Sequence, residues 1–275
     1  MLRRIVLLFA CSISLMACMP DVPEEASSGS VGPISFEKAT FAQSGGPQCP
    51  DKPDTTPENM HCATVKLDYP TIVKASTPEA TKQLNQFILQ QLLDYTDAND
   101  QQPSTPADLA KLFIADYEQS PEATGTWELD RKVGIVFGND KLLTLHYQEQ
   151  GNAGGPQPFS GQRYLVINSQ TGQQLTLADL LVANFKDQLN AVGERAFRRA
   201  NNIPPNSNLD MAGFTFENNA FRLNTNFGVT EEGLLFVFNP YEIGADATTT
   251  SEFLIPYPDI KPLIPPTSPL AALAP

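Results

Sequence analysis

Hydrophobic positions along the chain recur with two different periods, and these periods divide the first half of the sequence into elements. In residues 63–69 every second residue is apolar, which predicts a β-strand that ends at Pro70. Thr77 and Thr105 each precede a proline and an apolar stripe at helical spacing. Because a threonine N-cap followed by proline starts a helix well, we predict one helix after each threonine.

Strand patterns dominate the second half. The pattern predicts a hairpin of residues 127–137 and 143–147, a strand at 163–167, and two helices that begin near Thr176 and Phe185. Paired apolar positions from Phe214 to Phe238 then predict an antiparallel meander, followed by a strand at 253–257 and a short helix to Ile264. Helices and antiparallel hairpins in separate blocks indicate an α+β fold, one compact body of two halves.

Proline marks both ends of the chain. The sequence has 24 prolines, of which seven lie in residues 20–57 and seven in 256–275. No hydrophobic period persists at either end, so we expect a Pro/Ser-rich tether over residues 18–58 and a Pro/Ala-rich tail over 265–275. The folded body is then predicted to run from about Cys49 to Ile264.

The first residues have the pattern of a secretory signal. Two arginines precede a short apolar run, and Leu15-Met16-Ala17-Cys18 resembles a bacterial lipobox. Residues 1–17 are therefore predicted to be a lipoprotein signal peptide, with Cys18 lipidated and anchoring the protein to a membrane. Cys11 is a rival, but cleavage there leaves an apolar core of about six residues, below the usual length. Met19 after the cysteine favours the outer membrane, facing the periplasm, by analogy with lipoprotein sorting.

Cys49 and Cys62 remain in the rest of the chain. Two thiols in an oxidising compartment usually pair, so we predict a disulfide between them. A metal site is the alternative for this region, since His61 neighbours Cys62. No second cysteine or histidine stands at finger-like spacing, however, and we predict no metal and no cofactor.

The net charge of the chain limits the classes of partner that it can bind. The chain has 31 acidic and 18 basic residues and a net charge of −13, which becomes −15 when Arg3 and Arg4 leave with the signal peptide. An acidic protein lacks the basic face that nucleic acid requires, so we expect no nucleic-acid binding.

The sequence holds no zinc-protease, nucleophile-elbow, phosphate-loop or dinucleotide motif. His146 is interpreted as a half-buried sheet residue, and arginines near position 198 as complementing a helix dipole rather than binding a ligand.

The C-terminal part resembles the domain of unknown function at the end of RsiV-type proteins. The matching residues run from Gly233 through Asn239-Pro240-Tyr241-Glu242 to Ile243, and continue at 253–257 and 260–264. The 63–69 strand and the helix around Leu84 look like the companion domain of PdaC-type peptidoglycan deacetylases. The resemblance implies a PdaC-like half over residues 59–155 and an RsiV-like half over 156–264.

Several family features are missing. The Gly-Gly-Ala-His loop of many family members is replaced by Gly154-Gly155-Pro156-Gln157, and the deacetylase motifs of PdaC-type enzymes are absent. The transmembrane helix of RsiV-type anti-sigma factors is also absent, so sigma-factor control does not transfer. What the resemblance implies is an extracytoplasmic, envelope-associated module, which in RsiV binds lysozyme.

We therefore expect a non-enzymatic envelope lipoprotein that binds peptidoglycan or a cationic muralytic protein such as lysozyme. The candidate binding residues are Phe159, Tyr241, Glu242 and Asp246, and no catalytic residue is assigned. One alternative is a cell-wall glycan hydrolase or deacetylase that uses Glu242 and Asp246. The other is a structural component of the envelope.

Overall fold

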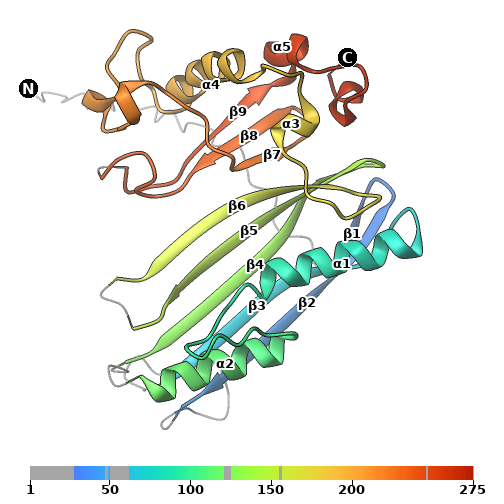
Figure 1. The fold of residues 1–275 in the computed structure, drawn as a ribbon, viewed down its shortest axis with the longest axis vertical. Helices are drawn as coiled ribbons and strands as arrows, with labels where there is room; N and C mark the ends of the chain where they lie inside the picture. The colour runs from blue at the N-terminus through green and yellow to red at the C-terminus, as the bar shows by residue number, and fades with distance from the viewer. Residues whose placement is uncertain are drawn as a thin grey trace, which may run out of the picture.

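A computed structural model of the chain describes residues 28–46, 49, 62–120, 125–154, 157–245 and 247–274. Two lobes make up the molecule (Figure 1): an N-terminal lobe around a six-stranded sheet and a C-terminal lobe around a three-stranded sheet. Helices together with one mixed and one antiparallel sheet confirm the α+β class. The predicted lipidation site, Cys18, lies outside the described residues.

The six-stranded sheet follows the chain order β1 to β6. β3 and β4 pair in parallel, and every other neighbouring pair is antiparallel. The parallel pair needs a crossover, which α1 (Pro78–Leu92) and α2 (Pro106–Gln119) provide. The strands are β1 (Ser28–Val31), β2 (Ile34–Gly45), β3 (Ala63–Lys74), β4 (Trp127–Gly138), β5 (Leu142–Asn152) and β6 (Phe159–Asn168).

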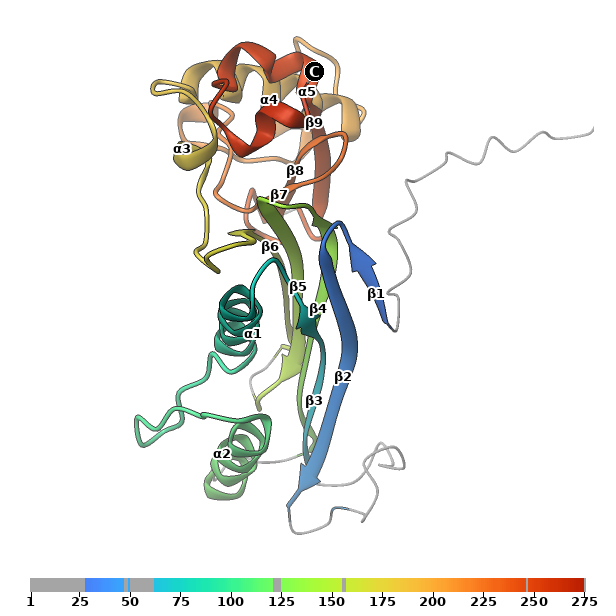
Figure 2. The ribbon, with the colours of Figure 1, turned by 90° about the vertical axis from the view of Figure 1, so that its right-hand side faces the viewer.

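Both helices cover the same face of this sheet (Figure 2). Their N-caps are the predicted threonines: Thr77 accepts a hydrogen bond from the Ala80 N–H and Thr105 from the Asp108 N–H. Leu84 and Phe113 are buried against the inward side chains of β3 to β5. The helical stripe therefore faces the sheet, as the spacing predicted.

The C-terminal lobe packs its helices on one small sheet. Phe197 of the long helix is fully buried and contacts five other phenylalanine rings at centroid distances of 5.0–5.8 Å. The elements are α3 (Leu177–Leu180), α4 (Lys186–Ala200), β7 (Phe227–Val229), β8 (Gly233–Phe238), β9 (Ser251–Pro256) and α5 (Tyr257–Ile260), with 3₁₀ turns at Asp210–Ala212, Glu217–Asn219, Lys261–Leu263 and Pro269–Ala272.

The structure differs from the predicted tether. Residues 28–45 form β1 and β2, so the sheet begins well before residue 59. β2 pairs with β3 along its whole length, although Ile34 is its only buried residue among those described. Because backbone pairing rather than apolar burial holds this strand, it has no hydrophobic period that a sequence pattern could reveal.

The predicted tail is also part of the folded body. Leu270 is fully buried in the C-terminal core, and the Ser268 hydroxyl donates to the Leu180 carbonyl at 2.7 Å. Proline suits this segment because its backbone forms a 3₁₀ turn, in which an N–H at the first position has no partner. A high proline content was therefore a poor guide to disorder here.

Three further boundaries differ. β3 continues past Pro70 to Lys74, which is tolerated because the pairing of β3 with β4 ends at Asp68. β6 pairs with β5 over ten residues, so the lobes divide after β6 and not at residues 155–156. The predicted strands between Phe214 and Leu223 are irregular, because their phenylalanines pack around Phe197 instead of in a ladder.

The predicted disulfide is present. Cys49 and Cys62 are bonded with their Cα atoms 5.1 Å apart, and the bond joins the end of β2 to the start of β3. Cys62 is fully buried. Closing a loop of this length stabilises the folded state by roughly 3 kcal/mol in the chain-entropy model.

Candidate functional site

One face of the six-stranded sheet is not covered by a helix in the part of the chain that the structure describes (Figure 2). Side chains alternate along a strand, so the neighbours of the helix-facing core residues point to this open face. Val65 and Leu129, for example, are buried under the helices, whereas Lys66 is exposed and Asp130 is half-buried. Apart from the end where Leu142 and Val166 pack into the C-terminal core, the open face is therefore polar.

The strand register aligns these outward residues in rows across the sheet. Directly paired positions carry two rows from β2 through β3, β4 and β5 to β6, and a third from β2 to β5. The first row is Thr40, Asp68, Lys132, Gln148 and Gln162; the second is Ala42, Lys66, Asp130, Gln150 and Ser160; the third is Ser44, Thr64, Glu128 and Asn152.

Three adjoining pockets follow these rows, with volumes of about 280, 540 and 270 Å³. Asp130 lines all three, so they adjoin one another, and together we call them the polar groove. The C-terminal lobe closes one end of the groove with Asn239, Pro240 and Thr250. Phe159 lines the opposite part.

Charges in the polar groove alternate in sign. Lys66 lies directly opposite Asp130 across the β3–β4 pair, and Asp68 lies opposite Lys132. Asp68 also forms an ion pair with Lys38 at 3.4 Å. Opposite charges side by side largely cancel at a distance, so the groove offers many hydrogen-bonding groups without a strong field of one sign.

Two asparagine side chains attach the C-terminal lobe to the free edge of β6. Asn239 accepts from the Gln162 N–H at 2.8 Å and donates to the Gln162 carbonyl at 3.0 Å. Asn226 accepts from the Tyr164 N–H at 2.8 Å and donates to the same Gln162 carbonyl at 2.9 Å. The two amides thus occupy the hydrogen-bonding groups that another strand would otherwise pair, and they fix the loop that closes the groove.

Glu242 has a structural role in this loop. Its carboxylate accepts from the Asn239 N–H at 2.8 Å and from the Asn224 side-chain amide at 2.7 Å. The Asn-Pro-Tyr-Glu motif is thereby explained in part, because Asn239 binds β6 and Glu242 holds Asn239. A carboxylate occupied in this way is poorly suited to the acid or base role that the hydrolase hypothesis gave it.

Tyr241 lies between these two fixed residues and is 63% exposed. Its φ of +65° is in the left-handed region, which is unfavourable for a tyrosine. The Tyr241 N–H donates to the Ala247 carbonyl at 2.7 Å, which helps to hold that conformation. An exposed aromatic residue in a strained backbone next to a groove is a candidate for ligand contact.

Phe159, with 37% exposure, is a second exposed aromatic residue that borders the polar groove. It pairs with Gly151, which pairs with Leu129 of the helix-facing core, so strand alternation directs its side chain toward the helix-covered face. Its ring crosses Gly151 of the neighbouring strand: a Cβ atom on Gly151 would lie 2.7 Å from the ring. The absence of a side chain at Gly151 therefore lets the ring lie close to the backbone of β5. Of the four predicted binding residues, Phe159 and Tyr241 are exposed at or beside the groove, Glu242 braces it, and Asp246 lies outside the described residues.

His146 lies between the lobes rather than in a catalytic arrangement. Its Nε2 is 2.6 Å from the Gln162 Oε1, and its ring stacks on Tyr164 at 4.6 Å. The Tyr164 hydroxyl donates to Glu252 of the C-terminal lobe. Burial and the nearby Glu252 carboxylate raise the pKa of Tyr164, so its hydroxyl stays protonated.

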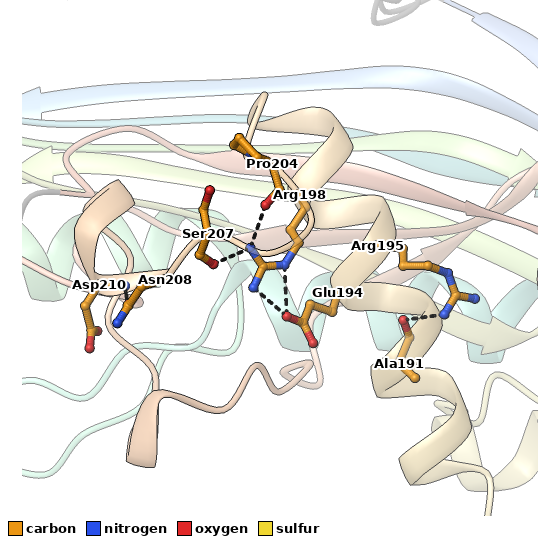
Figure 3. Close-up of polar contacts among 8 residues, drawn as sticks. All are labelled: Ala191, Glu194, Arg195, Arg198, Pro204, Ser207, Asn208 and Asp210. Atoms are coloured by element: carbon orange, nitrogen blue, oxygen red, sulfur yellow. Dashed lines mark hydrogen bonds and ion pairs between the residues drawn. The ribbon is translucent and has the colours of Figure 1, made fainter.

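The arginines of α4 stabilise the C-terminal lobe (Figure 3). The Arg198 guanidinium binds Glu194 and donates to the carbonyls of Pro204 and Ser207, which secures the loop after the helix. Arg195 donates to the carbonyl of Ala191 within the helix. These contacts agree with a structural role for the arginines.

The described residues contain no group of three or more histidine, cysteine, aspartate or glutamate side chains placed to hold a metal ion. Within the same residues, no helix has the length and apolar character needed to cross a membrane.

Comparisons with known proteins identify the C-terminal lobe. Residues 178–258 match the family described as "Protein of unknown function (DUF3298)", so the chain carries a DUF3298 domain. A search of curated proteins gives no match.

Two crystal structures share the fold over both lobes. A DUF3298 family protein from Pseudomonas aeruginosa PAO1 is 18% identical, with a TM-score of 0.63 over 85% of this chain and 95% of that one. A DUF3298 family member from Bacteroides fragilis NCTC 9343 is 13% identical, with a TM-score of 0.69 over 89% and 98%. At these identities the likeness concerns the fold alone.

Proposed function

We propose that this protein is a non-enzymatic, extracytoplasmic binding module whose polar groove holds a glycan strand, with peptidoglycan as the ligand. The observation that carries the proposal is the alignment of mostly polar side chains in two rows across β2–β6 and a third across β2–β5, along adjoining pockets with exposed aromatic residues nearby.

The chemistry of the groove suits a chain of sugars. Hydroxyl groups need both donors and acceptors, and Gln148, Gln150, Ser160, Asp130 and Lys132 supply both. The two longer rows span four inter-strand spacings, about 19 Å, which is long enough for several sugar rings. Other proteins bind oligosaccharides on an exposed sheet face flanked by loops, as OB-folds do.

The envelope location rests on the sequence. The predicted signal peptide and lipidated Cys18 would anchor the module to a membrane, with the outer membrane facing the periplasm as the favoured site. The resemblance to the RsiV-type domain and its PdaC-type companion supports the same compartment. In that compartment the abundant glycan strand is peptidoglycan.

The test is co-sedimentation of the full chain with purified, insoluble sacculi. The double variant Gln148→Ala/Gln150→Ala removes two exposed amides from the polar groove, and we expect it to reduce the bound fraction several-fold. The matched control is Gln86→Ala/Gln90→Ala, which removes two exposed amides from α1 on the opposite side of the sheet. The control should bind as the wild type does.

Equal binding by the groove variant and the control would disprove the groove as the glycan site. Release of soluble fragments or acetate from the sacculi would contradict a non-enzymatic role. If that release also stopped in Glu242→Gln, the hydrolase or deacetylase alternative would be supported. A chain that neither binds nor alters sacculi would leave the structural alternative as the better one.

The second candidate is binding of a cationic muralytic protein such as lysozyme, which the net charge of −13 favours. A pull-down with lysozyme at low and high salt tests it. Binding that disappears with salt and persists in Gln148→Ala/Gln150→Ala would place the partner outside the polar groove. No binding at low ionic strength would remove this candidate.

A further inference from the structure

A second pocket, of about 600 Å³, lies where β6 meets the C-terminal lobe. Its walls come from β6, residues 174–178, the start of α4 and residues 222–227. No residue that lines it also lines the polar groove, so it is a separate site. Its volume falls in the range of small-molecule sites, which often lie between domains.

The walls of this pocket are mainly apolar and stay accessible. Leu175, Leu177, Phe185 and Leu223 line it and are only partly buried, although they pack against the C-terminal core. Covering this apolar surface would gain hydrophobic free energy that the described fold leaves unused. The occupant should therefore have an apolar body.

The charged residues at the pocket have one sign. Lys186 and Arg222 line it, no carboxylate does, and neither cation forms an ion pair among the residues that the structure describes. The chain as a whole has a net charge of −13, so a pocket lined by two cations and by no carboxylate differs from the overall composition. The occupant should therefore have an anionic group at one end.

We propose that this interlobe pocket binds a small amphipathic anion, with its apolar body against Leu177, Phe185 and Leu223 and its carboxylate or phosphate group between Lys186 and Arg222. The proposal is independent of glycan binding, because the two sites share no residue.

Isothermal titration of the full chain tests it with four probes that contain a linear chain of ten carbons, the carboxylate carbon of decanoate included: decanoate, decyl phosphate, decanol and decyltrimethylammonium. At least one anion should bind, and the neutral and cationic probes should bind more weakly. The variant Lys186→Gln/Arg222→Gln should weaken anion binding about tenfold, as expected for two exposed ion pairs. The control Lys82→Gln/Lys111→Gln makes the same charge change on exposed residues of α1 and α2 and should bind as the wild type does.

Ala178→Trp adds bulk at an exposed position of the pocket wall and should abolish binding of every probe without lowering the unfolding midpoint. Preference for decanoate would support a fatty-acid-like carboxylate, and preference for decyl phosphate a phosphate ester. The proposal is overturned if neither anion binds, if decanol binds as tightly as the anions, or if Lys186→Gln/Arg222→Gln binds as the wild type does.

Discussion

At the residue scale, a buried charged residue makes several of the contacts that hold the N-terminal lobe together. Arg131 is 5% exposed and lies under the C-terminal end of α1. It donates to the carbonyls of Leu92 and Asp94 at 2.7 and 2.9 Å and forms an ion pair with Glu149. The same side chain therefore satisfies the carbonyl of the last residue of α1 and a carbonyl just beyond the helix, and it positions α1 on the sheet.

Replacing Arg131 should be strongly destabilising. We expect Arg131→Met to lower the free energy of unfolding by about 3 kcal/mol, because Glu149 loses its ion-pair partner and the carbonyls of Leu92 and Asp94 lose their donor. Urea unfolding of both proteins measures the difference. Arg195→Gln is the control, since Arg195 is exposed and makes one contact within its own helix, and it should change stability by less than about 0.5 kcal/mol. A similar loss in both variants would contradict the prediction.

A substitution at Tyr241 should affect stability and ligand binding differently. Glycine adopts a positive φ without strain, and this gain roughly offsets the larger entropy of glycine in the unfolded chain. We therefore expect Tyr241→Gly to stay within about 1 kcal/mol of the wild type while its binding to sacculi falls. Thermal unfolding and co-sedimentation check the two parts. Unchanged binding would show that the exposed ring does not contact the glycan.

At the element scale, backbone pairing and local turns place segments that have little hydrophobic pattern. β2 lies in the sheet through its pairing with β3, and the Pro269–Ala272 turn lies against the C-terminal core through Leu270. Both segments come from regions that composition assigned to a tether and a tail. Each segment becomes ordered because it packs against a partner element. That partner lies far away in the chain, so a short stretch of sequence does not show it.

The C-terminal turn should therefore be needed for stability. We expect Leu270→Ala to cost about 3 kcal/mol, since a fully buried leucine leaves a cavity when it is shortened. Denaturant unfolding gives the value. Leu273→Ala, in the same segment but only partly buried, should cost less. If Leu270→Ala were as stable as the wild type, the segment would be the loose tail that its composition suggested.

At the scale of the whole molecule, the two lobes are joined by apolar packing of Phe137, Leu142 and Val166 in the C-terminal core and by polar contacts from β5 and β6. Asn226 and Asn239 replace a neighbouring strand, and the Thr144 hydroxyl accepts from the Val229 N–H at 3.2 Å. Because one of these asparagines begins the loop that closes the polar groove, the docking of the lobes and the shape of the groove depend on the same bonds.

Asn239→Ala should weaken that docking. It removes two hydrogen bonds to Gln162, and we expect a loss of about 1–3 kcal/mol together with faster hydrogen exchange of the Gln162 amide. Amide exchange followed by NMR measures it. Asn208→Ala loses one exposed bond to Asp210 and should leave the Gln162 amide protected. Equal protection in both variants would show that Asn239 does not hold the lobes together.

Part of the candidate site could be predicted from sequence. Phe159 and the Asn-Pro-Tyr-Glu motif were recognised, because aromatic residues and the motif are visible locally. The polar rows were missed, although Lys66, Asp130 and Gln150 alternate with apolar residues on their strands. Alternation shows that they point away from the core, but only strand order and register show that they lie side by side.

The sequence by itself determined the helices and their threonine caps, the main strands, the α+β class and the pair of cysteines that bond, because each depends on short-range periodicity or on few possible partners. Tertiary structure alone decided that residues 28–45 and Leu270 belong to the body, that Glu242 braces a loop, and that two pockets with different chemistry exist. The physical reason is common to these cases. Backbone pairing, lobe docking and pocket walls join residues far apart in the chain, and local pattern contains no information about such distant partners.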